Sequence, residues 1–312
     1  MTVGTTPVAP AAPAPAEHPP PRRQRGRSTR SRYPLWFLLP GGGLLVLLFV
    51  VPTATSFYFS LTRWTLFDST FIGLENYVTF FQDPQLFGSF VHTLVYAVIT
   101  SVGKVVAGLA LAILLNGRII ARGYLRAVVF FPVLVSAVGV GITFKVLFDP
   151  FDGLINRALG VVGIDGPGWL TNPDLALASV AMVDIWKGVG VSTLIFMAGL
   201  VAIPRDYYES AHIDGATDWQ LFRFITLPLV GPATMTVVIL NVISGLRSFE
   251  LIWTMTGGGP GFTSDVLASV IYKKYQAGLY GLSTAGNVVM FVVVAAITIP
   301  LYRWFRRREV AQ

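Results

Sequence analysis

The chain has no cysteine, little histidine and few charged residues, and each shortage narrows the chemistry open to it. Without cysteine among its 312 residues, disulfides and thiolate metal sites are excluded. The three histidines, His18, His92 and His212, are far apart in the sequence, so a histidine-based metal centre lacks partners. No Ser/His/Asp combination stands at a recognisable spacing. We therefore expect neither a catalytic site nor a metal site in this chain.

Charged residues make up 12% of the chain and apolar residues 54%, whereas a soluble domain is roughly a quarter charged. The apolar residues are concentrated in long runs, and residues 35–61 and 276–302 contain no charge. About 20 apolar residues suffice to cross the ~30 Å hydrocarbon core of a bilayer. These runs predict an all-α polytopic membrane protein.

We expect about six transmembrane helices, at residues 35–61, 91–115, 124–147, 177–201, 229–255 and 284–304. They make residues 34–308 a single membrane domain, followed by a short tail, 309–312. Residues 1–33 are rich in proline and alanine and end in six arginines, and they have too few large apolar residues to fold alone. No aromatic residues are interleaved among these arginines, and the cluster adjoins a predicted span. Both features favour attraction to anionic lipid over nucleic-acid binding.

The positions of lysine and arginine predict the orientation. If both termini are cytoplasmic, the inner segments hold fifteen basic residues: Arg22, Arg23, Arg25, Arg27, Arg30, Arg32, Arg118, Arg122, Arg126, Arg205, Arg223, Arg303, Arg306, Arg307 and Arg308. The outer segments then hold four, Arg63, Arg157, Lys273 and Lys274. The excess predicts an N-in, C-in topology, from which Lys273 and Lys274 are a local departure.

The polar segment 204–228 lies between two apolar runs and carries the signals of two short helices. Pro204 suits the start of a helix, and Gly215 suits its left-handed end. Thr217 and Gln220 have the spacing of a capping box for a second helix that runs toward Pro228. The pattern predicts a helix–turn–helix on the inner surface. An amphipathic linker held at the lipid headgroups fits the same pattern.

The same segment resembles the EAA signature of the membrane subunits of ABC importers, EAA-x2-DGA-x5-F-x2-I-x-LP. Every fixed position matches except the second, where serine replaces alanine; the first eight positions of the signature contain Glu209, Ser210, Ala211, Asp214, Gly215 and Ala216. The resemblance implies that these residues form a coupling loop, which docks on an ATP-binding subunit and carries its closure to the spans. FIGLENY at 71–77, residues 185–204 and residues 249–265 resemble the carbohydrate-uptake branch, with its maltose and glycerol-3-phosphate transporters.

The glycine run 257–261 lacks the Gly-Lys-Ser/Thr of a phosphate-binding loop, and Pro260 removes one donor N–H group. We expect an external turn here. The chain has no Walker motif, so we expect it to bind no cofactor, with ATP and magnesium held by a partner ATPase.

Six charged residues fall inside the predicted spans, where charge is costly and marks function: Lys104, Lys145, Asp184, Lys187, Arg247 and Glu250. The spacing lets Asp184 meet Lys187, and Arg247 meet Glu250, on one helix face. Such pairs also suit a structural role against a partner subunit.

The fifth span carries a polar stripe of Asn241, Ser244 and Ser248, with Gly245 among them and Arg247 beside them. Neutral hydrogen-bonding groups suit sugar hydroxyls, so these five residues are the predicted substrate pathway. The resemblance places Asn241, Gly245 and Ser248 where the family contacts its sugar. Because Arg247 is basic, a substrate that carries a phosphate or carboxylate group also fits this stripe. Packing of these polar residues against a partner permease is the structural alternative.

The sequence thus predicts a non-enzymatic permease subunit of an ATP-driven carbohydrate importer in the cell membrane. Six spans form half a pathway, which implies a second homologous permease, an ATPase dimer and an extracytoplasmic solute-binding protein as partners. Two rivals stay open, a secondary transporter coupled through Asp184 or Glu250, and a membrane scaffold that docks an ATPase without transport.

Overall fold

The computed structural model describes residues 35–65, 67–117 and 120–309. The predicted tail 1–33 lies outside them. The chain divides into two compact units, residues 1–49 and 50–312, and each is described by itself. In the first unit a 3₁₀ turn, η1 (Leu35–Leu38), precedes α1 (Leu39–Leu45) and a π-helical turn, η2 (Val46–Val50), which runs one residue past the boundary.

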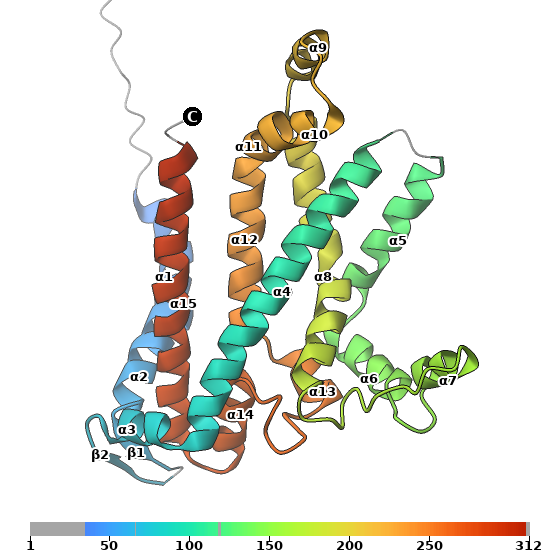
Figure 1. Ribbon diagram of the computed structural model, residues 1–312. Coiled ribbons are helices and arrows are strands. Elements are labelled where there is room, and N and C mark those ends of the chain that lie inside the picture. The colour runs from blue at the N-terminus through green and yellow to red at the C-terminus, as the bar shows by residue number, and fades with distance from the viewer. Residues whose placement is uncertain (1–34, 66, 118–119, 310–312) are drawn as a thin grey trace, which may run out of the picture. The chain divides into compact units, whose positions relative to one another are not determined.

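The second unit is nearly all helical, with one short hairpin (Figure 1). The hairpin pairs β1 (Thr62–Trp64) with β2 (Ser69–Phe71) in antiparallel register. The helices before the polar loop are α2 (Val51–Phe59), α3 (Glu75–Gln82), α4 (Pro84–Asn116), α5 (Arg122–Leu134), α6 (Ala137–Leu147), α7 (Leu154–Val161) and α8 (Ala176–Val201). Those that follow are α9 (Arg205–Ile213), α10 (Asp218–Leu221), the π turn η3 (Phe222–Thr226), α11 (Leu227–Leu229), α12 (Gly231–Leu246), α13 (Glu250–Met255), α14 (Leu267–Gln276) and α15 (Tyr280–Glu309).

Four helices of the described chain are long and apolar enough to cross a membrane: Trp36–Phe59, Pro84–Asn116, Ala176–Val201 and Tyr280–Arg307. They cover the predicted first, second, fourth and sixth spans. Two bent pairs bring the number of candidate spans to as many as six. The chain is therefore a mostly helical protein with four to six membrane-spanning segments.

The third predicted span, 124–147, is not one straight helix. α5 and α6 meet at a bend of 99°. Val135 and Ser136 adopt extended backbone angles at the break, and Pro132 removes a helical hydrogen-bond donor just before it. α5 alone has 13 residues, or about 20 Å of helix, which falls short of the ~30 Å apolar core.

The fifth predicted span, 229–255, is also interrupted. α12 ends at Leu246, residues 247–249 leave the helix, and α13 begins at Glu250. At its other end, α12 is bent by 66° from the helical run Asp218–Leu229. The break before α13 contains Arg247 and Ser248, which interrupt an otherwise apolar run, whereas the bend before α12 lies in apolar sequence next to Gly231 and Pro232.

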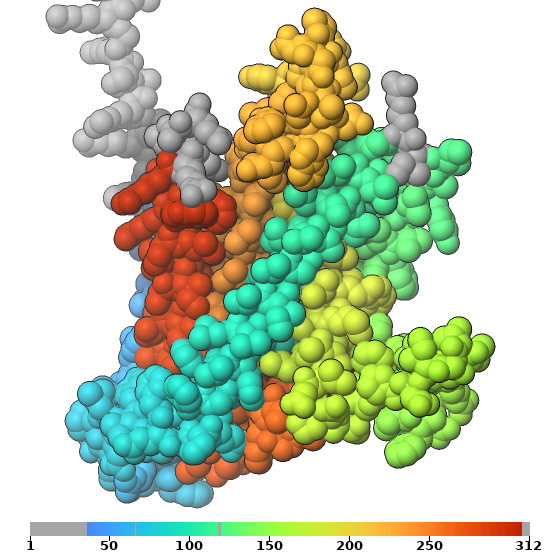
Figure 2. All heavy atoms as spheres, in the orientation of Figure 1, coloured from blue at the N-terminus to red at the C-terminus, as the bar shows by residue number. Residues whose placement is uncertain are grey.

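Within the second unit, α9, α10 and α11 lie at one end of the spans, which we call the α9 end (Figure 1). The β hairpin, α3, α6, α7, α13 and α14 lie at the opposite end, called the α14 end. α9 and α10 project beyond the ends of the neighbouring helices as a separate knob (Figure 2). The predicted cytoplasmic segment and the predicted outer glycine run therefore lie at opposite ends.

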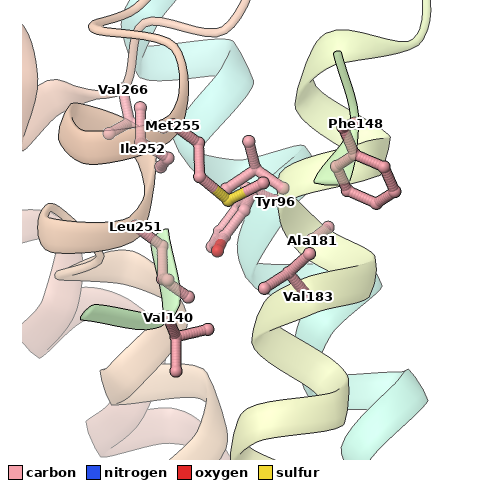
Figure 3. Close-up of a cluster of buried hydrophobic side chains, with 10 residues drawn as sticks. Tyr96, Val140, Phe148, Ala181, Val183, Leu251, Ile252, Met255 and Val266 are labelled. Atoms are coloured by element: carbon pink, nitrogen blue, oxygen red, sulfur yellow. The ribbon is translucent and has the colours of Figure 1, made fainter. Parts of the chain in front are cut away.

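The core of this unit forms where α4 packs along α8 and α12. Small residues permit the close approach, since a Cβ atom on Gly245 of α12 would lie 2.7 Å from the Ala97 Cα atom of α4. Toward the α14 end, Tyr96, Val183 and Leu251 belong to a buried apolar cluster that joins α4, α8 and α13 (Figure 3). Through this cluster α13, which follows the break after α12, packs against the continuous helices α4 and α8.

Candidate functional sites: the α9–α11 loop and a charged cavity

The first part of the signature, from Glu209 to Ala216, lies on α9 and on the turn that ends it. Pro204 precedes the first residue of α9, and Gly215 adopts a φ of +78°, as the sequence predicts. The Gly215 N–H donates to the His212 carbonyl and the Ala216 N–H to the Ala211 carbonyl, at 3.1 and 3.0 Å. This bonding pattern is a Schellman motif, which fixes the direction in which the chain leaves the helix. Gly215 is needed here because a side chain is strained at this φ.

The second helix begins with the predicted capping box. The Gln220 N–H donates to the Thr217 hydroxyl, and the Thr217 N–H donates to the Gln220 side-chain oxygen at 2.8 Å. A hydrogen bond of 3.0 Å between the Tyr208 and Thr226 hydroxyl oxygens ties α9 to η3. The loop is therefore held as a defined unit by its own residues.

The surface of this unit is accessible. Glu209, Ser210 and Asp214 are exposed, and so are the large side chains of Tyr207, Ile213 and Trp219. The same loop contains a groove of about 300 Å³, lined by Ala211, Asp214, Gly215, Ala216, Gln220, Leu221, Phe224 and Ile225. Exposed apolar side chains on a loop that also carries a groove are typical of a docking surface.

The charged residues of the spans are arranged differently from the predicted pairs. Asp184 does not pair with Lys187, since its carboxylate accepts a hydrogen bond of 2.9 Å from the Lys104 ammonium group of α4. Lys104 is 3% exposed and Asp184 is 15% exposed. Arg247 and Glu250 make no ion pair with each other, because the helix breaks between them. The contact of Asp184 across two helices leaves no signal in local sequence.

Three of the five predicted pathway residues line one cavity. Ser244, Arg247 and Ser248 border a space of about 360 Å³ where α12 ends, together with Asp184, Lys187 and Glu250. This volume lies in the range of sites for small molecules. The break after Leu246 brings these side chains to the mouth of the space.

The other two predicted residues face neighbouring helices. The Asn241 side chain donates 2.9 Å hydrogen bonds to the Ser192 hydroxyl of α8 and to the Val237 carbonyl. Gly245 is buried against α4. In this structure both residues take part in helix packing, while Ser244, Arg247 and Ser248 border the cavity.

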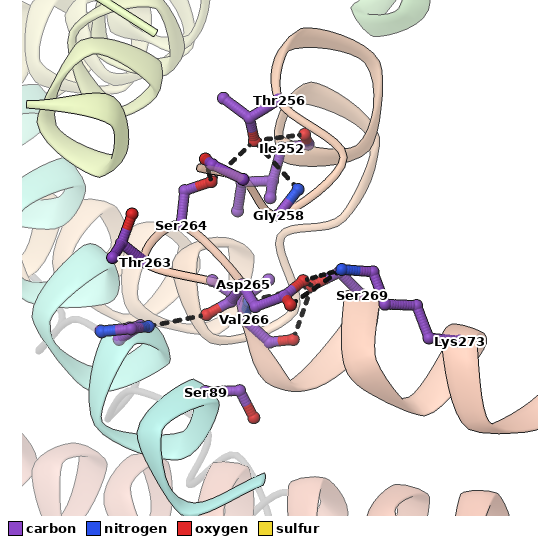
Figure 4. Close-up of polar contacts among 12 residues, drawn as sticks. Ser89, Ile252, Thr256, Gly258, Thr263, Ser264, Asp265, Val266, Ser269 and Lys273 are labelled. Carbon is purple, nitrogen blue, oxygen red and sulfur yellow. Dashed lines mark hydrogen bonds and ion pairs between the residues drawn. The ribbon is translucent and has the colours of Figure 1, made fainter. Parts of the chain in front are cut away.

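The glycine run forms a turn at the α14 end that is attached to a buried carboxylate (Figure 4). Asp265 is fully buried and accepts two 2.8 Å hydrogen bonds from Lys273 and one from Ser269. Gly258 packs directly on this carboxylate, where any side chain would collide. Sequence reasoning missed this cluster, although Asp265, Ser269 and Lys273 are spaced by four residues, which places their side chains on one helix face. Among the described residues, no three His, Cys, Asp or Glu side chains gather as possible metal ligands.

The fold and these sites define a class of protein: a polytopic α-helical membrane protein with an exposed two-helix loop at one end and a polar cavity between its spans. Residues 104–310 match the family described as the binding-protein-dependent transport system inner membrane component, and the chain belongs to this family. It is therefore an ABC importer permease, a multi-pass membrane protein, and ATP hydrolysis occurs in a separate subunit.

Known relatives agree along most of the chain. The trehalose/maltose transport system permease protein MalF of Thermococcus litoralis is 33% identical over 264 residues, covering 84% of this chain and 90% of that protein. The sulfoquinovosyl glycerol transport system permease protein of Agrobacterium fabrum is 33% identical over 276 residues, covering 87% and 90%. A bacterial alginate ABC transporter, solved in complex with an alginate pentasaccharide-bound periplasmic protein, has a matching chain with a TM-score of 0.77 and 26% identity, covering 88% and 94%. These matches support the importer interpretation over the secondary transporter and the scaffold.

Proposed function

We propose that this permease has six spans with both termini in the cytoplasm and that it moves a carbohydrate inward. Its coupling loop, residues 204–228, docks on an ATPase dimer, and a second homologous permease completes the pathway. An extracytoplasmic solute-binding protein delivers the sugar. ATP and magnesium are held by the ATPase, and this chain binds no cofactor. The observation that carries the proposal is the signature, folded as an exposed and internally fixed two-helix unit at one end of the spans.

The orientation is supported by where the basic residues lie in the structure. At the α14 end, all four basic residues of the predicted outer segments form ion pairs: Arg63 with Glu75, Arg157 with Asp152, Lys273 with Asp265 and Lys274 with Asp83. At the α9 end, seven arginines with described side chains make no ion pair with a described acidic residue: Arg122, Arg126, Arg205, Arg223, Arg303, Arg306 and Arg307.

Lysine and arginine near the span ends retain a segment on the cytoplasmic side, and acidic residues contribute little to this effect. The α9 end holds seven of these basic residues and the α14 end four, so Lys273 and Lys274 stay a local departure from the overall excess. Arg118 and the tail arginines lie outside the described residues, and their part in the topology stays a prediction.

The coupling mechanism rests on the rigidity of the loop. Glu209 and Asp214 supply polar contacts across the interface, Ser210 and Ala211 permit close approach, and Gly215 with Ala216 sets the turn. The Tyr208–Thr226 bond and the short run through α11 connect the loop to α12. Closure of the ATPase dimer moves this unit and shifts the spans between inward and outward access, because the two states make different contacts with the ATPase.

The carbohydrate class is supported by the relatives, which are named for trehalose and maltose, sulfoquinovosyl glycerol and alginate. The cavity agrees with such a substrate, because Ser244 and Ser248 present hydroxyl groups that hydrogen-bond to sugar hydroxyls. The role of Asn241 and Gly245 in the pathway stays a prediction. These residues would reach the cavity if α12 moves against α4 and α8 during the change of access.

Substitutions in the loop test the proposal. Glu209→Lys reverses an exposed charge of the docking surface, and Gly215→Pro removes an N–H donor at a φ of +78° that proline does not adopt. We expect each variant to insert normally and to lose sugar uptake in cells that carry the complete importer. Asp174→Lys makes a matched charge change at an exposed residue outside the loop and should keep uptake. Full uptake by Glu209→Lys and Gly215→Pro would refute the coupling role.

A further inference from the structure

The cavity at the end of α12 contains more positive than negative charge. Of its charged residues, Asp184 is already balanced by Lys104, which lies behind the cavity wall and is almost completely buried. Three charges are then left at the surface of the cavity: Lys187, Arg247 and Glu250. The two cations outnumber the single remaining anion.

These three charges are not neutralised by one another. Neither Lys187 nor Arg247 has an acidic oxygen within 4.0 Å among the described residues, and Glu250 has no basic nitrogen within that distance. The guanidinium group of Arg247 also donates no hydrogen bond to a described residue, while the Arg247 backbone N–H donates to the Ile243 carbonyl. Its position explains this freedom, because residues 247–249 lie outside both helices and separate Arg247 from the first turn of α13.

Free cations at membrane depth are costly unless a partner compensates them. A guanidinium group offers a planar fork of donors that matches a carboxylate or a phosphate, and a nearby ammonium group adds a point charge. Ser244, in the last turn of α12, and Ser248, just beyond the end of that helix, both line the cavity and supply hydroxyl groups for the neutral part of a ligand. The set suits a polyhydroxylated molecule that carries one anionic group.

We infer that the sugar moved by this permease is acidic, and that Arg247 and Lys187 bind its carboxylate or phosphate group in the cavity at the end of α12. The inference rests on the proposed function, carbohydrate import. Glu250 accepts hydrogen bonds from sugar hydroxyls and leaves the cavity one net positive charge, which balances a single carboxylate and part of the charge of a phosphate monoester. The two kinds of anion share this chemistry and are separated by the probes below.

Proteoliposomes with the complete importer, including the companion permease, the ATPase and the binding protein, provide the test. The probes are matched sets, glucose with glucuronate and glucose 6-phosphate, and cellobiose with cellobiouronic acid. We expect ATP hydrolysis and uptake to respond to acidic members at least about 10-fold more than to neutral ones. A response to glucuronate or cellobiouronic acid identifies the carboxylate, and a response to glucose 6-phosphate identifies the phosphate.

Charge-neutral variants then link the selectivity to the cavity. Arg247→Gln and Lys187→Gln should each lower uptake of the acidic sugar by roughly 10-fold or more at saturating binding protein, because each removes a charge-assisted hydrogen bond. Arg247→Lys should keep part of the activity. Arg157→Gln, at an exposed ion pair of the α14 end, should keep all of it.

Two outcomes overturn the inference while leaving sugar import intact. In the first, the neutral member of a set is the better substrate. In the second, the two variants lower uptake of neutral and acidic sugars equally, which would mean that acidic residues of the companion permease compensate these cations. If no sugar of either kind stimulates ATP hydrolysis but another class of solute does, the proposed function itself fails.

Discussion

Replacing Asp184 with leucine removes the carboxylate that balances Lys104 between α4 and α8. The Lys104 side chain is 3% exposed and packs closely on the backbone of Gly188. Its Cε atom lies only 2.7 Å from the position that a Cβ atom on Gly188 would occupy. The Lys104 ammonium group is therefore enclosed by protein and not by water. Loss of one partner of a buried ion pair costs about 3–5 kcal/mol, because the other charge stays buried and unpaired. At about 2–4 °C per kcal/mol, the melting temperature should fall by roughly 6–20 °C.

The reverse substitution should cost less. Lys104→Met leaves Asp184 unpaired, but Asp184 is 15% exposed and lines the cavity. We expect a loss of about 1–3 kcal/mol. The double variant Lys104→Met/Asp184→Leu should recover most of the stability, because no charge is then left buried.

Thermal unfolding of the purified protein, followed by circular dichroism, measures all four forms. Arg157→Gln provides a matched control, since its ion pair with Asp152 is exposed and contributes about 0–1 kcal/mol. Equal losses in the two single variants, with their sum in the double variant, would refute the reasoning that the charges are coupled and that Lys104 is the more deeply buried.

Three further substitutions test the packing of the spans by the same unfolding measurement. Gly245→Val should destabilise the protein by about 1–3 kcal/mol, because the new side chain forces α12 away from α4. Gly139→Val is the control and should have little effect, since nothing lies within 4 Å of its Cβ position. Equal effects of the two variants would contradict the close approach of α12 to α4. Asn241→Leu should cost about 0.5–1.5 kcal/mol through its lost bond to Ser192, and an unchanged melting temperature would refute that role. Asp265→Asn should cost about 1–3 kcal/mol, more than the exposed Asp152→Asn, and the opposite order would count against the buried cluster under the glycine turn.

Local features of this chain were predictable because local sequence determines them. Pro204, Gly215 and the Thr217/Gln220 pair act within a few residues, and the helices they predict are those observed. Four of the six spans also follow from apolar length, since each is a continuous helix. The docking role of the loop residues stays a prediction.

The remaining features depend on contacts between distant segments. The bend at Val135 and Ser136 lies within an apolar run, where a helix can change direction without a change in hydrophobicity. The break after Leu246 falls on Arg247 and Ser248, which the span prediction treated as part of one helix. The partner of Asp184 is 80 residues away, so the local spacing to Lys187 indicated the wrong contact. The fifth-span stripe was found by periodicity, but Asn241 and Gly245 face α8 and α4, which no single helix can reveal.

Transport by the complete importer in proteoliposomes tests the central claim most directly. Vesicles would be prepared with or without ATP inside, each with an ion gradient either imposed or abolished by ionophores, and supplied with the binding protein and its sugar. We predict that sugar accumulates only with ATP and that Gly215→Pro in the coupling loop abolishes accumulation. Accumulation driven by an ion gradient without ATP, or undiminished in Gly215→Pro, would contradict the account.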